Sequence, residues 1–189
     1  AFPPGINALF VVAVLVVVTQ ARSLEALAVT LDSLDWAGDT KDRGALESGG
    51  YRGTGSIIGL VLAILAKYLL ISHLIEAESL RSLFFFPTVG RWAMVCAAWF
   101  FPIAEADFAG YVTWRDFSWA TGLTLLCSIL THGLIGVGIM MLVWVMVYAL
   151  GQTWTKRRGT ITIPVMGAGV ELAEILALAA LVGVLGSPS

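Results

Sequence analysis

Long apolar stretches separated by short polar segments run through most of this chain. A helix needs about 20 mainly apolar residues to cross the roughly 30 Å of hydrocarbon in a bilayer. Because lipid offers no partners to free backbone groups, stretches of this length predict α-helices. The pattern therefore predicts an all-α, polytopic membrane helix bundle that forms one domain over residues 1–189, with six membrane-spanning segments, two of them short: residues 6–21, 54–75, 92–104, 118–130, 133–150 and 163–185.

The fourth and fifth segments form one apolar stretch that is too long for a single span. A helix over residues 118–150 would be about 50 Å long at 1.5 Å per residue, well beyond the hydrocarbon core. A break near Thr131, His132 and Gly133 resolves this. We therefore expect two helices here, joined close to Gly133.

The distribution of basic residues gives an orientation. With six spans, eight basic residues share one side of the membrane and two lie on the other, whereas merging the two segments gives five against five. The positive-inside rule favours the first arrangement. We expect a bacterial inner or cytoplasmic-type membrane, both termini outside the cytoplasm, and these eight residues on the cytoplasmic side: Arg22, Lys41, Arg43, Arg52, Arg115, Lys156, Arg157 and Arg158.

Composition agrees with the membrane class, since 58% of the residues are hydrophobic and 13% are charged. The expected partners are membrane lipid and other integral membrane subunits, with no nucleic acid. Cys96 and Cys127 both lie in apolar segments, where small buried thiols are the expected state rather than a disulfide or a metal site. The chain begins without Met, which indicates a trimmed or incompletely covered N-terminus, although a natural processed end also fits.

Charged residues inside the apolar segments need partners. Lys67 lies within residues 54–75, and Glu171 lies within the last segment. Because an isolated ion at membrane depth is costly, we expect these two residues to pair, with Glu174 one turn further on in the same network. The group is interpreted either as a polar cavity or as a structural lock. A small-molecule transporter is a further hypothesis that rests on these charges alone.

The only two histidines, His73 and His132, lie close to segment ends. Either is a candidate ligand of a haem or another pigment. Nothing pairs them at metal-ligand spacing, and a histidine that bonds a carbonyl or a lipid headgroup at a helix end is the commoner case.

Several motifs resemble, in the same order, those of one enzyme family. They are Leu-Glu-Ala-Leu-Ala-Val-Thr-Leu-Asp-Ser from Leu24, Arg-Gly-Thr-Gly from Arg52, Leu-Ala-Lys-Tyr from Leu65, Gly-Arg-Trp-Ala-Met from Gly90, and Gly-Ala-Gly-Val-Glu-Leu-Ala-Glu from Gly167. The chain thereby resembles cobalamin synthase, the adenosylcobinamide-GDP ribazoletransferase family, over nearly its whole length, without that family's first hydrophobic region. The resemblance implies an enzyme that joins α-ribazole or its phosphate to a GDP-activated corrinoid, releases GMP and requires Mg²⁺.

The resemblance also shows which carboxylates are missing. Glu25 and Asp32 occupy the first and third acidic positions of the first motif, but Val29 occupies the second. The Asp-Ser-Arg motif is replaced near Arg52 by Gly50-Tyr51-Arg52, or one residue earlier by Gly49-Gly50-Tyr51. In the last motif Thr162 is kept, while Ile163-Pro164 replaces Gly-Asp. Three of five expected carboxylates are therefore absent, and the remnant positions are Glu25, Asp32, Arg52 and Thr162.

Neighbouring acids offer a replacement for a metal site. Asp32, Asp35 and Asp39 follow a spacing that would place them on one helical face, with Asp42 close by. The other interpretation is a solvated loop whose acids offset its basic residues. We expect a catalytically silent relative that serves as an accessory or structural subunit of a larger membrane complex and binds no cofactor. The alternative is an active transferase that uses Mg²⁺.

Overall fold

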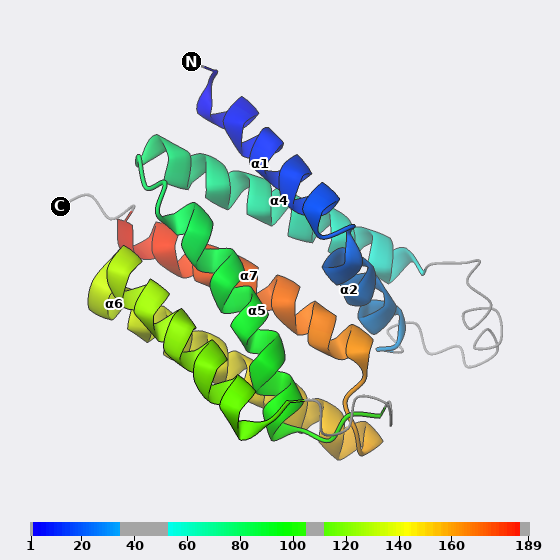
Figure 1. Ribbon diagram of the computed structural model, residues 1–189. Helices are drawn as coiled ribbons and strands as arrows, with labels where there is room; N and C mark the ends of the chain where they lie inside the picture. Colours follow the sequence, from blue (N-terminus) through cyan, green and yellow to red (C-terminus); the bar gives the residue numbers. More distant parts are fainter. Residues whose placement is uncertain (1, 35–52, 105–111, 186–189) are drawn as a thin grey trace.

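The computed structural model describes residues 2–34, 53–104 and 112–185. The predicted all-α fold is confirmed, because the elements of these residues are helices (Figure 1). They are α1 (Pro4–Val18), α2 (Arg22–Asp32), α4 (Thr54–Glu76), α5 (Ser82–Phe100), α6 (Trp114–Arg158) and α7 (Ile163–Leu185).

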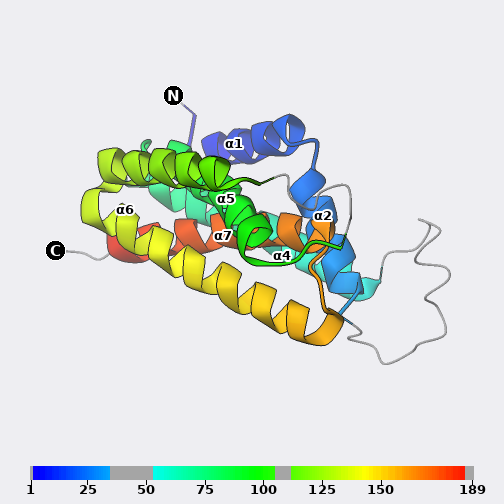
Figure 2. The ribbon, with the colours of Figure 1, turned by 60° about the horizontal axis from the view of Figure 1, so that its bottom comes forward.

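Helix α6 is a helical hairpin, and this confirms the predicted break. Gly133 has φ 60° and ψ −136°, a conformation open essentially only to glycine. Ser128 and Met140 would be about 18 Å apart along a straight helix. Instead, the Ser128 hydroxyl lies 3.9 Å from the Met140 sulfur. Figure 2 shows the two arms, residues 114–132 and 134–158, reversing direction at the turn and diverging from it.

The first predicted span is wrong in its bounds. The apolar stretch of residues 6–21 ends as a helix at Val18, and the chain then bends by 81° into α2. Gln20 and Ala21 take left-handed φ values of 53° and 54°, which residues with a side chain rarely adopt. Since no glycine or proline stands at this bend, the sequence pattern gave no sign of it.

The third predicted span is also wrong in its bounds. Helix α5 begins at Ser82 rather than at position 92, and it includes Pro87. Arg91 consequently lies inside a helix instead of in the loop before it. Phe85 and Phe86, just before Pro87, are fully buried, so they extend the side of this helix that packs on the core.

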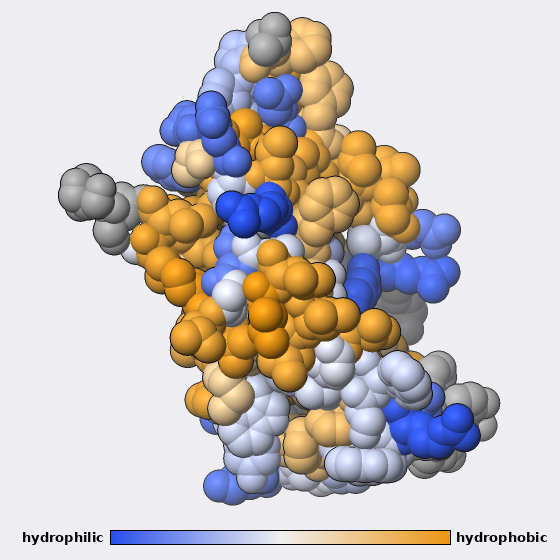
Figure 3. Space-filling view, turned by 60° about the vertical axis from the view of Figure 1, so that its left-hand side comes forward, coloured by the Kyte–Doolittle hydropathy of each residue, from blue (hydrophilic) through white to orange (hydrophobic). Residues whose placement is uncertain are grey.

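By length and composition, four of the helices in the described ranges are able to cross a membrane, namely α4, α5, α6 and α7, and the bent pair α1 and α2 makes a fifth. The hairpin α6 is counted once here although it has two arms. Large apolar side chains such as Leu62, Leu126 and Leu134 are exposed. Hydrophobic residues also cover much of the face shown in Figure 3. A surface of this kind is suited to contact with lipid.

Helix α7 occupies the centre of the bundle, where it contacts α2, α4, α5 and α6. Small residues make this possible, since Ala173 and Ala177 are fully buried and permit close helix packing. Cys96 on α5 is buried in the same core, and both cysteines are free thiols. Helix α1 lies mainly on α4 at the edge of the bundle (Figure 1).

Candidate functional site

Three charged residues meet in the interior of the bundle. The Lys67 ammonium on α4 lies 2.5 Å from a carboxylate oxygen of Glu171 and 2.6 Å from one of Glu174, both on α7. All three residues are at least 94% buried, with exposed fractions of 6%, 2% and 5%. The structure thus brings together the three residues for which the sequence predicted one polar network.

Neighbouring helices complete this network. The Ser23 hydroxyl, in the first turn of α2, donates a hydrogen bond of 2.5 Å to the other carboxylate oxygen of Glu171. Two carboxylates face one ammonium, so the group carries excess negative charge when all three residues are ionised. The N-terminal end of α2 carries partial positive charge, which offsets part of this excess. Four residues from three helices, Ser23, Lys67, Glu171 and Glu174, form what we call the polar joint.

The remnant motif residues lie at one end of the bundle, which we call the motif end. Asp32 closes α2, and its carboxylate accepts a hydrogen bond of 3.1 Å from the backbone N–H of Gly53, just before α4. Thr162 immediately precedes α7, and its carbonyl accepts from the N–H of Met166. Arg158, at the end of α6, donates a hydrogen bond of 2.8 Å to the carbonyl of Ser33. The ends of α2 and α6 and the starts of α4 and α7 therefore meet here.

The contact between α2 and α7 at the motif end is very close. A Cβ at Gly167 would approach the Cβ of Ala26 to 2.5 Å, so only glycine fits this position without a shift. Ala26, the residue after Glu25, is thereby held against the beginning of α7. Two of the three substituted acidic positions are described, and neither offers a carboxylate: Val29 is 42% exposed on α2, and Pro164 lies in the first turn of α7. The third, at Gly49 or Gly50, lies outside the described residues.

The described residues do not by themselves fit a Mg²⁺ ion. No group of three or more acidic, histidine or cysteine side chains suited to a metal occurs within residues 2–34, 53–104 and 112–185. Glu25 and Asp32 are seven positions apart on α2, which is about 10 Å along the axis, too far for both to bind one ion directly. Asp35, Asp39, Asp42 and Arg52 lie outside the described residues.

The two histidines that the sequence offers as candidate pigment ligands both lie near helix ends or turns in the described structure. His73 is 68% exposed at the side chain and lies 3.7 Å from Glu76, one turn further along α4. His132, at the turn of the α6 hairpin, lies 3.3 Å from the Ser82 hydroxyl, and its ring makes a T-shaped contact with that of Phe85. Each therefore lies beside a polar side chain rather than a backbone carbonyl, and its role as a pigment ligand stays a prediction.

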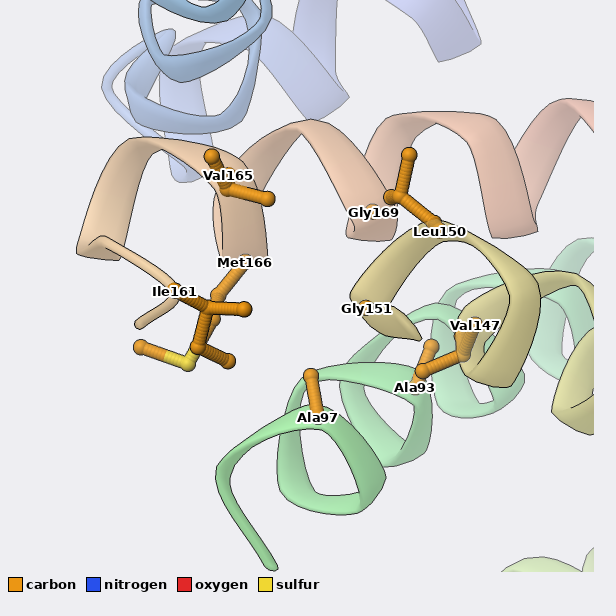
Figure 4. Close-up of a pocket in the computed structure, with 9 residues that line it drawn as sticks. All are labelled: Ala93, Ala97, Val147, Leu150, Gly151, Ile161, Val165, Met166 and Gly169. Carbon is orange, nitrogen blue, oxygen red and sulfur yellow. The ribbon is translucent and has the colours of Figure 1, made fainter. Parts of the chain in front are cut away.

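A small cavity between α5, α6 and α7 is apolar. The residues around it in Figure 4 carry hydrocarbon or thioether side chains, or none in the case of Gly151 and Gly169. It offers no group for acid–base chemistry or for metal binding.

Sequence reasoning missed three contributors to this arrangement. Ser23 was not singled out from the sequence, and its partner is 148 positions away. Gly90 was noted only as part of a motif, although it makes room for Glu174. Arg158 was counted only as a loop charge. Short-range spacing contains no signal for contacts of this range.

Comparison with known proteins points to the family that the sequence motifs resemble. The chain matches the Cobalamin-5-phosphate synthase family over residues 1–182. It is 31% identical to an adenosylcobinamide-GDP ribazoletransferase of Geotalea daltonii, over 98% of this chain and 77% of that protein. It is 32% identical to the protein of that name from Escherichia coli K12, over 92% and 74% of the two chains. A Roseiflexus relative of the same name is 36% identical over 50% of this chain, which spans 37% of that protein.

No solved structure matches the chain. The helices, their apolar surfaces and the buried polar joint define a helical integral membrane protein. With the match over nearly its whole length, the chain belongs to the Cobalamin-5-phosphate synthase family.

Proposed function

We propose that this chain catalyses the reaction named for its relatives, the transfer of ribazole to adenosylcobinamide-GDP. The observation that carries the proposal is the meeting of the family's motif segments at one end of the bundle. The end of α2, the start of α4 and the start of α7 are far apart in sequence, yet Asp32 is bonded to Gly53 and Gly167 packs on Ala26. The family match over residues 1–182 supports it.

The proposal assigns a specific task to Asp32. One of its oxygens accepts from Gly53, and a carboxylate has lone pairs left for a further partner. It is thus a fixed negative group at the motif end. Since the described residues do not make a metal site, the acids that complete a divalent-ion site on this proposal come from Asp35, Asp39 and Asp42.

A second candidate is a catalytically silent member of the family that serves as an accessory or structural subunit of a larger membrane complex. The observation that favours it is the apolar chemistry of two motif positions, Val29 and Pro164. In a site built on carboxylates, each missing charge costs on the order of several kcal/mol of stabilisation. Its partners would be other integral membrane subunits and lipid.

One assay separates the two candidates. The purified protein in lipid nanodiscs is supplied with α-ribazole, adenosylcobinamide-GDP and Mg²⁺, and both GMP release and the corrinoid product are measured. The transferase proposal expects turnover that falls at least about 100-fold in Asp32→Asn, the scale of losing one transition-state contact. Thr30→Val is the matched control, because Thr30 lies on the same helix and its hydroxyl bonds only within that helix, to the Ala26 carbonyl. Absence of turnover overturns the transferase proposal. Turnover unaffected by Asp32→Asn overturns the role of Asp32.

A further inference from the structure

The polar joint lies where the α1–α2 segment changes direction. Helix α1 ends at Val18, the chain bends at Gln20 and Ala21, and Ser23 follows in the first turn of α2. The side chain of Ser23 is 6% exposed and bonds Glu171 at 2.5 Å. A bend of 81° is therefore followed at once by a buried hydrogen bond to the central helix.

This bond acts on the beginning of α2, whereas the motif residues lie further along the helix. At the far end, Asp32 contacts Gly53 and the Ser33 carbonyl contacts Arg158. Between the two ends, Ala26 touches Gly167, and Leu31 occupies the space that a side chain at position 59 would need. Helix α2 is thus held at both ends by polar contacts and along its length by two glycine contacts.

The two kinds of contact differ in what they fix. The apolar contacts against glycine prevent α2 from moving closer to its neighbours. They lose little energy when α2 slides or rotates slightly, because dispersion has weak directionality. A short hydrogen bond to a buried carboxylate has a preferred distance and angle. Lys67 holds that carboxylate from the other side, and Glu174 shares the same ammonium. The direction of α2 therefore depends on the Ser23 hydroxyl and on the carboxylate that Lys67 orients.

We infer that Ser23 and Glu171 are positioning residues. Their hydrogen bond sets the angle and register of α2 against α7, and so places Asp32 at the motif end. The consequence for catalysis rests on the proposed transferase function, while the geometric statement stands without it.

The geometric test uses spin-label distances in nanodiscs. Labels are attached at Val29→Cys on α2 and Lys156→Cys on α6, both exposed positions, after Cys96 and Cys127 have been replaced by alanine. Ser23→Ala should shift or broaden the distance distribution, and Ser23→Thr, which restores a hydroxyl, should return it toward that of the parent. Thr30→Val is the matched control, because Thr30 is also 6% exposed and lies on α2, but its hydroxyl donates to the Ala26 carbonyl of the same helix. It should leave the distribution unchanged.

A second variant keeps the test decisive if Ser23→Ala does not fold. Glu171→Gln retains an acceptor for Ser23 but loses the charge that Lys67 holds, so it should broaden the same distribution. An unchanged distribution in every folded variant of Ser23 and Glu171 overturns the inference.

The activity arm is read separately. If the parent turns over, Ser23→Ala should lower kcat more than it raises KM, and Ser23→Thr should restore kcat. If the parent is inactive, the transferase proposal fails while the distances still decide the inference. If the parent turns over and the distance distribution of Ser23→Ala is unchanged, the inference fails while the transferase proposal stands.

Discussion

Gly90 on α5 faces Glu174 on α7 so closely that a Cβ at position 90 would approach the Glu174 Cγ to 2.6 Å. The missing side chain lets α5 pack directly over the polar joint. Glu174 is consequently 5% exposed although it carries a carboxylate, and its partner is Lys67. The close helix contact and the buried ion pair depend on each other.

Replacing Gly90 with alanine should destabilise the protein. The added methyl group displaces Glu174 from its contact with Lys67, and overpacking of this kind costs about 1–3 kcal/mol. Thermal unfolding in detergent would show a lower midpoint. Gly122→Ala is the control, because nothing lies within 4 Å of the added Cβ there, and alanine improves helix propensity by roughly 1 kcal/mol. Equal or higher stability of Gly90→Ala would contradict the close contact.

The polar joint should show strong energetic coupling. Lys67→Met leaves two carboxylates buried together without a cation and should destabilise by about 3–5 kcal/mol. Glu171→Gln leaves Lys67 paired with Glu174, so it should also destabilise, but by less. The double variant removes both members of one pair and should cost clearly less than the sum. Unfolding free energies of the parent, the two single variants and the double variant give the coupling. Strict additivity would show that the pair has no energetic role.

The sequence predicted the bundle because the apolar character and the length of a span are local properties of the chain. The break at Gly133 was predictable for the same reason, since 33 consecutive residues exceed a bilayer. The bend at Gln20 and Ala21 was not, because ordinary residues take left-handed φ there under tertiary constraint. The start of α5 was missed because Pro87 signals a break, whereas packing keeps the helix intact.

The part of the site that the sequence predicted is the buried ion pair, because a charge inside a membrane needs a partner of opposite charge. Lys67 and Glu171 are the clearest charges inside apolar stretches, and a membrane leaves them few alternatives to each other. The roles of Ser23 and Gly90 were not predictable, because a serine and a glycine carry no such demand and their partners come from other helices.

Gly133 should tolerate substitution poorly although space surrounds it. A Cβ at this position meets nothing within 4 Å, so any cost comes from the backbone conformation alone. With φ 60° and ψ −136°, alanine should destabilise the hairpin by about 1–3 kcal/mol. Gly138→Ala, also open but lacking a positive φ, serves as the control. The comparison of the two unfolding midpoints tests the hairpin, and equal midpoints would contradict a sharp reversal at Gly133.

The last prediction concerns which compartment the motif end faces. Arg115, Lys156, Arg157 and Arg158 lie in the first and last turns of α6, next to the loops expected for them. Arg22, which begins α2, and Arg91, which lies inside α5, do not lie in the loops expected for them. Without them, the count of eight against two becomes seven against one, because one residue leaves each side. The asymmetry survives, so the positive-inside rule still predicts a cytoplasmic motif end.

Cysteine labelling in sealed inside-out and right-side-out vesicles measures this orientation. In a background with Cys96 and Cys127 replaced, Leu34→Cys and Lys156→Cys should react with an impermeant reagent only from the cytoplasmic side. These two positions lie beside the Ser33 and Arg158 contact, so the structure requires them to react from the same side. Leu80→Cys, in the turn between α4 and α5, should react from the other side, since α4 runs away from the motif end. Opposite reactivity of Leu34→Cys and Lys156→Cys would refute the fold in the membrane, whereas joint labelling from outside would refute only the orientation.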